Sequence, residues 1–254
     1  MTEQAYATVH NGNSPAVALT ANWILQALPA AELETLRSHA SLVALQRHDV
    51  LFQPNELIDR VYFPVDGIVS LVCVMRDGGG VETATIGREG MVGTSIFHGV
   101  ATASQQAIVQ IPGRAFAIDS AVFARIVTDM PTLTAILHRF AVVLFTLAAQ
   151  NSACNRKHSI EERCCRWMLM VGDRLDRDTF ELTHDFISQM LGVRRASVTE
   201  ALGALEKRGL VRTSRGKITL VDRAGLEQTV CECYGVIRSA VTDLLAGNGH
   251  RATI

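Results

Sequence analysis

Two short amphipathic stretches separated by a glycine, and followed by a strand-like pair, constrain the fold of residues 183–220. The first stretch, LTHDFISQML, places Thr183 at a natural helix N-cap and apolar residues on one face. Gly192 can take the backbone angles of a tight turn, and a second helix is predicted from about Arg194 to Lys207. Alternation around an Arg-Gly pair in LVRTSRGKITLV predicts a β-hairpin. The sequence therefore predicts a helix-turn-helix with a hairpin wing.

The charge of this segment differs from that of the rest of the chain. Residues 183–223 contain eight Lys or Arg and four Asp or Glu, a balance of +4, whereas the whole chain carries −1 and the remainder therefore −5. A local positive patch on an otherwise acidic protein indicates a polyanionic partner. A solvated helix face is the alternative that charge asymmetry alone leaves open.

The second predicted helix has the side chains suited to base recognition. The major groove of B-DNA accepts one α-helix, and the N-terminal end of a recognition helix lies nearest the base edges. Arg195 occupies that end, and an arginine can donate two parallel hydrogen bonds to O6 and N7 of guanine. Phosphate contacts are expected from the polar and basic residues near it, namely Thr183, Arg194, Ser197, Arg215 and Lys217. A helical hairpin used for protein contacts is the competing interpretation.

Short strand-like segments dominate residues 41–118. LVALQ, DRVYFPV, GIVSLVCVM, VETATI and QQAIVQI are rich in Val, Ile, Tyr and Phe, and Asp-Gly and Pro-Gly sequences lie between them. Several short strands with turn signals at this density predict an antiparallel barrel or sandwich. Two short helices, over 22–28 and 29–37, are expected before the strands, and residues 1–19 are expected to be a disordered polar tail.

A long helix is predicted from Pro131 to about Lys157. Pro131 suits a first helical turn because its missing N–H is not needed there. Apolar residues recur at near-heptad spacing, the pattern of a helix that pairs with a copy of itself. We therefore predict dimerisation through Leu133, Leu137, Phe140, Leu144 and Leu147. A single amphipathic helix lying on its own barrel is the alternative.

On these residues the chain resembles the Crp/Fnr superfamily of bacterial transcription regulators. LTHDFISQMLGVRRASVTEALGALEKRGLV is similar to the helix-turn-helix of that family, RVYFPVDGIVSLV and IGREGMVG to its sensor barrel, and residues 131–157 to its dimerisation helix. The resemblance covers about residues 20–225. It implies a homodimer that binds a near-palindromic operator in double-stranded DNA and that recruits or blocks RNA polymerase.

The expected fold class is α+β, with four segments along the chain. They are a tail at 1–19, an antiparallel, cyclic-nucleotide-binding-like β-roll with flanking helices at 20–130, a dimerisation helix at 131–157, and a winged helix-turn-helix domain with a C-terminal helix at 158–254. The boundary near 155–160 precedes Ser159-Ile-Glu-Glu162, which has the form of a capping box.

The resemblance also assigns roles to single residues. It places base contacts at Arg195, Ala196, Thr199 and Glu200, and backbone contacts at His184, Ser197 and Arg215. Arg195 falls on the family's guanine-reading arginine. The cyclic-AMP-responsive branch has Glu and Arg where this chain has Ala196 and Glu200, so we expect an operator that differs from the one that branch recognises.

The predicted sensor departs from the family's cyclic-nucleotide pocket. That pocket uses a Gly-Glu pair for the ribose and an Arg-Ser-Ala run for the cyclic phosphate. This chain aligns Gly93 and Thr94 with the first, and Ala103, Ser104 and Gln105 with the second. Without the arginine a buried phosphate would lack its charge-assisted partner, unless Arg88 or Arg114 replaces it. We therefore expect a regulator that cyclic AMP does not control, or one without an effector.

The cysteines are interpreted as small buried hydrophobic residues, with no metal site. The chain has six, and all but Cys73 lie in its second half, at positions 154, 164, 165, 231 and 233. On a continuous C-terminal helix Cys231 and Cys233 would point about 200° apart, a poor chelating pair unless the helix is broken. A redox- or gas-responsive regulator that uses these late cysteines or a bound cofactor is the alternative of the same fold, and the sequence assigns no cofactor.

The sequence has no recognised catalytic motif. We find no Ser/His/Asp order, Walker loop or zinc-spaced Cys/His set, and GREGMVG precedes strand-like sequence instead of opening a helix. The longest apolar run, at 140–149, is about half of the roughly 20 residues that span a bilayer. We therefore expect a cytoplasmic DNA-binding protein that is not an enzyme and has no membrane contact. The alternative of another class is a sensor that acts through protein contacts.

Overall fold

The computed structural model describes residues 19–76 and 78–246, which fall into two compact units. The first unit comprises residues 1–69 and 86–141, and the second comprises 70–85 and 142–254. The units cut across the segments expected from sequence, because residues 70–85 group with the C-terminal half and the long helix contributes to both units. Residues 1–18 of the expected tail lie outside the described residues.

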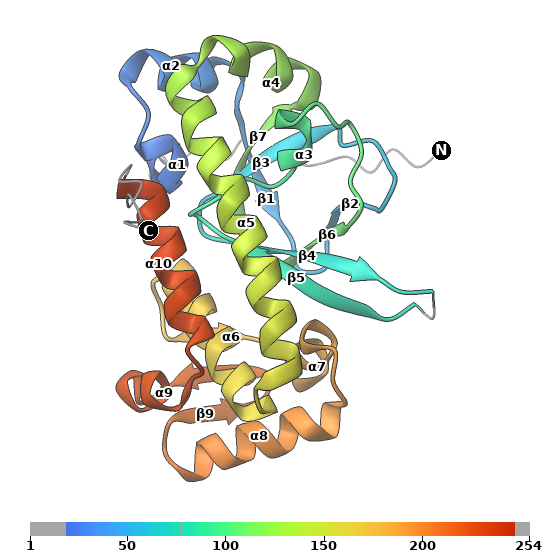
Figure 1. The fold of residues 1–254 in the computed structure, drawn as a ribbon, viewed down its shortest axis with the longest axis vertical. Coiled ribbons are helices and arrows are strands. Elements are labelled where there is room, and N and C mark those ends of the chain that lie inside the picture. Colours follow the sequence, from blue (N-terminus) through green and yellow to red (C-terminus); the bar gives the residue numbers. More distant parts are fainter. Residues whose placement is uncertain (1–18, 77, 247–254) are drawn as a thin grey trace, which may run out of the picture. The chain divides into compact units, whose positions relative to one another are not determined.

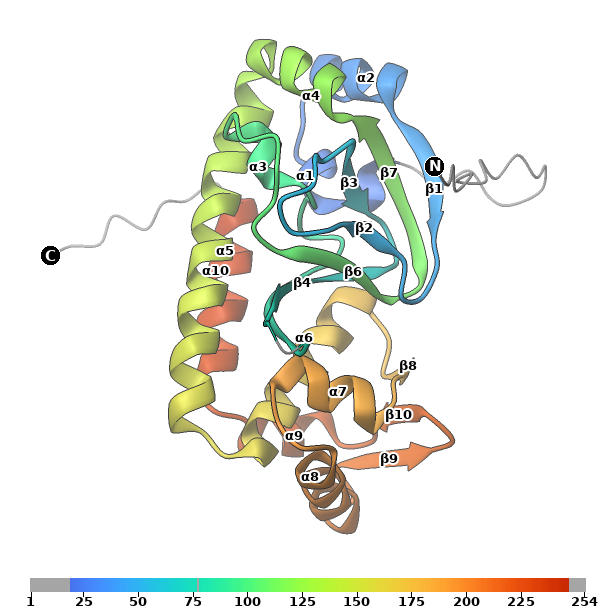
Figure 2. The ribbon, with the colours of Figure 1, turned by 90° about the vertical axis from the view of Figure 1, so that its right-hand side faces the viewer.

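Strands of the N-terminal half form two sheets (Figures 1 and 2). They are β1 (Ser41–Leu45), β2 (Val50–Phe52), β3 (Arg60–Pro64), β4 (Ile68–Val74), β5 (Gly80–Ile86), β6 (Gln106–Ile111) and β7 (Gly113–Asp119). The sheet orders are β1-β7-β3 and β2-β6-β4-β5. Strand β7 pairs antiparallel with both β1 and β3, and β2 pairs antiparallel with β6. The antiparallel strand domain predicted over 41–118 is confirmed.

Two turn sequences of the first unit pack directly against each other. A Cβ atom added to Gly113 would lie 2.4 Å from the backbone nitrogen of Gly67, so only glycine permits this approach of the two turns. Asp66 accepts hydrogen bonds from the backbone nitrogen and from Nε of Arg114, at 2.6 and 2.9 Å. Arg114 is therefore bound to a carboxylate.

Helices flank the sheets of the first unit. They are a 3-10 turn at Leu19–Ala21, α1 (Trp23–Gln26), α2 (Ala30–His39), α3 (Thr94–Phe97), α4 (Ser120–Ile126), a 3-10 turn at Val127–Asp129 and α5 (Pro131–Lys157). The carboxylate of Glu32 in α2 accepts hydrogen bonds from the backbone nitrogens of Thr132 and Leu133, at 3.0 and 2.9 Å. These bonds satisfy donors that an α-helix leaves unpaired at its start, so α2 helps to fix where α5 begins.

Helix α5 has the predicted bounds, but the structure corrects the prediction for its seam. Leu133, Leu137, Phe140 and Leu147 are at most 2% exposed, so they pack within their own chain and have no surface left for a partner. Leu144 is half-buried. The side chains that α5 exposes are different ones, with Val142 63% and Phe145 76% exposed. By length and mean hydropathy alone α5 could cross a membrane, a test that core helices also pass.

The second unit contains the winged helix-turn-helix. Its elements are α6 (Ile160–Leu175), β8 (Thr179–Glu181), α7 (His184–Leu191), α8 (Arg195–Lys207), β9 (Val211–Ser214), β10 (Lys217–Leu220), α9 (Arg223–Thr229) and α10 (Cys233–Ala246). The predicted capping box begins α6, since the Ser159 hydroxyl accepts from the Glu162 nitrogen at 3.3 Å and the Glu162 carboxylate accepts from the Ser159 nitrogen at 2.8 Å. The wing sheet has the order β8-β10-β9.

The single C-terminal helix assumed for the Cys231–Cys233 pair is wrong. Helix α9 ends at Thr229, and Val230 has extended backbone angles of φ −70° and ψ 151°. Helix α10 begins only at Cys233. The angular separation that a continuous helix would impose on the two thiols therefore does not apply.

A buried carboxylate explains why residues 70–85 belong to the second unit. Glu82 of β5 accepts hydrogen bonds from Nε1 of Trp167 at 3.0 Å, from Ser70 at 2.6 Å and from Thr85 at 2.8 Å. Burial raises the pKa of Glu82. Burying this carboxyl group would destabilise the fold if the three donors did not bond it. The Asn151 side chain of α5 also donates to the Thr83 carbonyl, at 2.8 Å. Hydrogen bonds thus connect the β4–β5 pair to α5 and α6.

Candidate nucleic-acid interface

Helix α7 and the turn after it have the predicted geometry. The Thr183 hydroxyl accepts a hydrogen bond from the Phe186 nitrogen at 3.1 Å, which caps the helix. Gly192 ends α7 with φ 63°, in the left-handed region that glycine favours. A Cβ atom at Gly192 would lie 2.9 Å from Cγ2 of Val81, so glycine is needed both for the angle and for the space.

Helix α8 separates a buried face from an exposed one. Val198, Leu202 and Leu205 are at most 1% exposed and pack into the domain. The four predicted base-contacting residues lie on the exposed part of the helix: Arg195, Ala196, Thr199 and Glu200. Arg195 begins the helix and Arg194 is its N-cap residue, so both lie at the end that enters a groove first.

A hydrogen-bonded chain fixes the start of α8 against the start of α7. The Thr199 hydroxyl donates to the Arg195 carbonyl at 3.1 Å and lies 3.0 Å from Nδ1 of His184. Because a hydroxyl has one hydrogen to donate, the His184 ring must donate from Nδ1 to Thr199. The hydroxyl of Thr199 thus already bonds two protein groups.

The carboxylate of Glu206 connects the wing to α8. Glu206 accepts from the backbone nitrogen and the hydroxyl of Thr213, at 2.8 and 3.1 Å, and these bonds lower the pKa of Glu206. Arg215 and Gly216 form the tip of the hairpin, with φ 46° and 78°, as expected for a tight two-residue turn. Lys217 lies 3.6 Å from the Glu181 carboxylate, and both side chains are 58% exposed. An exposed pair of this kind contributes little, so it leaves the ammonium able to meet a phosphate.

A concave surface of about 350 Å³ lies between the helix-turn-helix and the wing. It brings together predicted contact residues from α7 and its N-cap, from α8, and from the turn and second strand of the wing hairpin: Thr183, His184, Arg195, Arg215 and Lys217. Figure 2 shows α7 and α8 beside the β9–β10 hairpin that borders this surface. The remaining predicted contacts do not line this concave surface. Arg194 is the N-cap residue of α8, and the others lie on the helix itself: Ala196, Ser197, Thr199 and Glu200.

The predicted effector residues come from several segments of the first unit. The Arg88 guanidinium lies over the ring of Trp23, 5.0 Å from its centroid, and makes a cation–π contact with it. Gly93 precedes α3 with φ 91° and Thr94 begins that helix. The Ala103 carbonyl accepts from the Asn55 nitrogen at 2.7 Å, and Ser104 and Gln105 follow before β6.

The sequence interpretation missed one group of residues. Cys154, His158, Cys231 and Cys233 present ligand atoms that all lie within 4.8 Å of one another. From the sequence, Cys231 and Cys233 are considered as a pair and are not connected with His158. The burial predicted for the late cysteines is confirmed, and Cys73 is half-buried. The signal that could have found the group is the Cys154-x-x-x-His158 spacing, since residues four apart share a helix face.

Comparisons with known proteins agree with the two halves of this architecture. Residues 42–129 match the cyclic nucleotide-binding domain family, and residues 162–229 match the Crp-like helix-turn-helix domain family. The CRP-like cAMP-activated global transcriptional regulator of Mycobacterium tuberculosis is 26% identical over 207 residues, which cover 78% of this chain and 91% of that protein.

Solved structures show the same fold at low sequence identity. FixK2 from Bradyrhizobium japonicum has a TM-score of 0.65 at 17% identity and covers 76% of this chain and 98% of its own. The c-di-GMP-responsive global regulator CLP of Xanthomonas campestris has a TM-score of 0.62 at 13% identity, covering 76% and 99%. A cyclic nucleotide-binding domain followed by a Crp-like helix-turn-helix identifies this chain as a member of the Crp/Fnr family of DNA-binding transcription regulators.

Proposed function

We propose that two copies of this chain bind a near-palindromic DNA operator, with one Arg195 in the major groove of each half-site. The observation that carries the proposal is the concave surface of the second unit, where Arg195, Arg215, Lys217 and His184 lie together. A recognition helix and a basic wing that share one concavity can contact base edges and the flanking phosphates at the same time.

The roles on this surface differ from residue to residue. Arg195 is exposed at the start of α8 and is suited to a bidentate contact with guanine O6 and N7. Thr199 offers a methyl group, which suits contact with a thymine methyl, because its hydroxyl bonds protein groups. Ala196 and Glu200 are also assigned to base contacts, where the cyclic-AMP-responsive branch has Glu and Arg. Contacts with the DNA backbone are assigned to Thr183, His184, Arg194, Ser197, Arg215 and Lys217.

Dimerisation is assigned to the exposed face of α5. Val142 and Phe145 are 63% and 76% exposed, an unusual exposure for large apolar side chains on a helix of this length. Residues three and four apart lie on the same helix face, so these two side chains form one apolar strip. Two such strips that pack against each other would remove both from water and would bring two recognition helices to one duplex.

Control by cyclic AMP is not part of the proposal. The relative from M. tuberculosis is named as cAMP-activated, but this chain has Ala103 where the family pocket has the phosphate-binding arginine. Of the two candidate replacements, Arg114 is bound to Asp66 and Arg88 lies on Trp23. A cyclic phosphate would be buried without a charge-assisted partner, which disfavours binding. The chain would act in the cytoplasm by binding and not by catalysis, and would recruit or block RNA polymerase.

The test is selection of bound duplexes from a random library with the full chain, followed by binding to the selected site across a salt series. We expect a two-fold symmetric site with a G·C pair in each half and half-sites about one helical turn apart. Affinity should fall steeply with salt because phosphates release counterions. Added cyclic AMP should leave the affinity unchanged. An asymmetric or absent consensus, or weak salt dependence, would contradict the proposal.

A further inference from the structure

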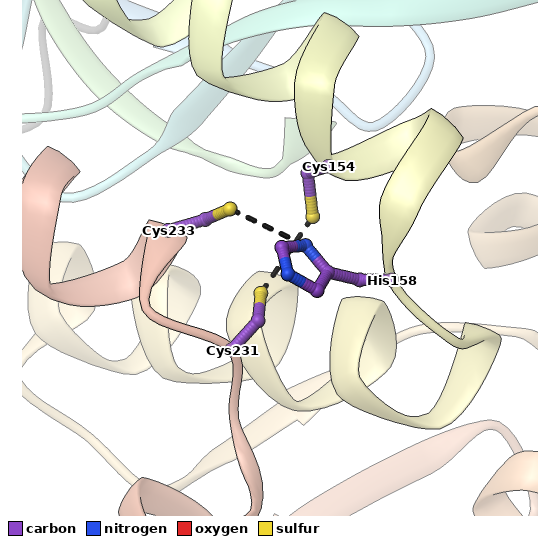
Figure 3. A group of neighbouring side chains, drawn as sticks. All are labelled: Cys154, His158, Cys231 and Cys233. Carbon is purple, nitrogen blue, oxygen red and sulfur yellow. Dashed lines mark hydrogen bonds between the residues drawn. The ribbon is translucent and has the colours of Figure 1, made fainter.

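Three thiols and one imidazole converge at a place where two parts of the second unit meet (Figure 3). Cys154 and His158 come from the end of α5, whereas Cys231 and Cys233 come from the break between α9 and α10. We call these four residues the Cys/His cluster. Its three sulfur-bearing side chains are at most 4% exposed. This cluster lies outside the proposed DNA-binding surface and plays no part in the proposed function.

Two separations within the Cys/His cluster are close to those around a single tetrahedral ion. The sulfur atoms of Cys154 and Cys231 are 3.6 Å apart, and Sγ of Cys233 lies 3.5 Å from Nδ1 of His158. Ligands at ordinary Zn–S and Zn–N bond lengths on a tetrahedron would be about 3.8 Å apart for two sulfurs and about 3.6 Å for sulfur and nitrogen. These two separations are therefore close to those that a zinc ion requires, and no two ligand atoms of the cluster are more than 4.8 Å apart.

The surroundings of the cluster orient its ligands. His158 directs Nδ1 toward the thiols, and its Nε2 lies 3.2 Å from the Glu232 carboxylate, which would fix the proton on Nε2 and leave the Nδ1 lone pair for a metal. The Gln150 side chain donates to Sγ of Cys233 at 3.1 Å.

We propose that Cys154, His158, Cys231 and Cys233 bind one Zn²⁺ ion in a closed, four-ligand structural site. Four protein ligands leave no open coordination position, which distinguishes a structural zinc site from a catalytic one. Thiolate and imidazole ligands in a tetrahedral arrangement favour zinc over magnesium, calcium or manganese. The ion would join the end of α5 to the start of α10, across a connection that no regular secondary structure supports.

Two other uses of these thiols are less compatible with the geometry. A multi-iron cluster distributes its ligands over several metal ions and thus spreads them further than one ion does, whereas these ligand atoms lie within 4.8 Å. A Cys154–Cys231 disulfide would use two of the four groups and would leave His158, with its Glu232 partner, without a role. The zinc site alone uses all four side chains.

The experiment measures metal in the full chain, purified with reductant, without added metal and with any affinity tag removed. We expect one zinc per chain by plasma mass spectrometry, and loss of that zinc in Cys154→Ser, His158→Ala, Cys231→Ser and Cys233→Ser. The matched controls are Cys73→Ser and Cys165→Ala, which change thiols outside the cluster and should keep the metal.

A second measurement needs no variant, because a ligand substitution could simply unfold the domain. Alkylation of the folded wild-type chain should spare Cys154, Cys231 and Cys233, and all three should become labelled once a chelator has removed the zinc. Cobalt exchanged for zinc should give the visible absorption of a tetrahedral ion and a thiolate charge-transfer band. A folded chain that takes up neither Zn²⁺ nor Co²⁺ would overturn the proposal. So would zinc that all four variants retain, iron in its place, or a Cys154–Cys231 disulfide in the purified protein.

Discussion

The proposed DNA-binding surface and the Cys/His cluster lie in the same unit, but they present their polar groups to opposite environments. Arg195, Arg215 and Lys217 extend into water, where charges are screened and each side chain is separately available to a partner. The thiols of Cys154 and Cys233 are fully buried, where a polar group is tolerated only when it has partners. Removing a surface residue should therefore weaken DNA binding, whereas removing a cluster residue should destabilise the folded domain.

The two regions also differ in how their residues depend on one another. The surface residues are joined mainly through the protein, as when Glu206 connects α8 to Thr213 of the wing. The cluster residues are ligands of one proposed ion, so loss of any one of them also removes the stabilisation that the other three provide by binding that ion. We therefore expect nearly additive effects on the surface and strongly non-additive effects in the cluster.

The largest expected effect is that of zinc removal. Chelation should lower the Tm of the second unit by about 10 °C or more, because the ion binds the folded state and its loss withdraws that binding free energy. Calorimetry with and without chelator, followed by readdition of zinc, would measure the change. The Arg195→Ala variant is the matched control and should show the same Tm and the same response. A Tm that does not change on chelation would show that the Cys/His cluster does not stabilise the second unit through a bound metal.

The next effect concerns an exposed apolar side chain. Phe145→Glu should dissociate the dimer, since a charge in an apolar interface is left without a partner, and operator affinity should fall by about 100-fold or more as the second half-site is lost. Sedimentation velocity would report the mass. Arg195→Ala should remain a dimer. A dimer unchanged by Phe145→Glu would show that the chains pair through another face.

A smaller effect is expected from Arg195→Ala on its own. The variant should lose about 1–3 kcal/mol of discrimination at one base pair in each half-site, with an unchanged Tm, because the guanidinium is exposed and supports no packing. Competition binding with operators changed at each position would locate the loss. Equal weakening at every position would instead make Arg195 a phosphate contact.

The smallest effect is expected from Lys217→Ala. This variant should weaken all duplexes alike and should reduce the slope of log affinity against log salt by about one, the contribution of one phosphate contact. Its ion pair with Glu181 is exposed and should contribute little to stability. Fluorescence anisotropy across a salt series would measure the slope, with Glu181→Gln as control. A loss confined to one sequence would assign Lys217 to base recognition.

Local sequence patterns predicted most elements of the second unit. The Thr183 cap, the Gly192 turn, the Ser159–Glu162 capping box and the hairpin at Arg215 each depend on residues within about four positions of one another. Interactions of that range are encoded in short stretches, so the helix-turn-helix and its wing could be placed before any coordinates. The break between α9 and α10 had no comparable signal, and the prediction of one continuous helix there was wrong.

By itself the sequence determined which segments become helices and strands, and which family's architecture they follow. Only the tertiary structure decided which face of α5 stays exposed, because its apolar stripe is wide enough to serve either the chain itself or a partner. It also decided that Cys154 meets Cys231, 77 residues further on, and that His158 meets Cys233. Periodicity describes neighbours along one element, whereas a ligand set drawn from distant elements exists only after packing has closed the loops between them.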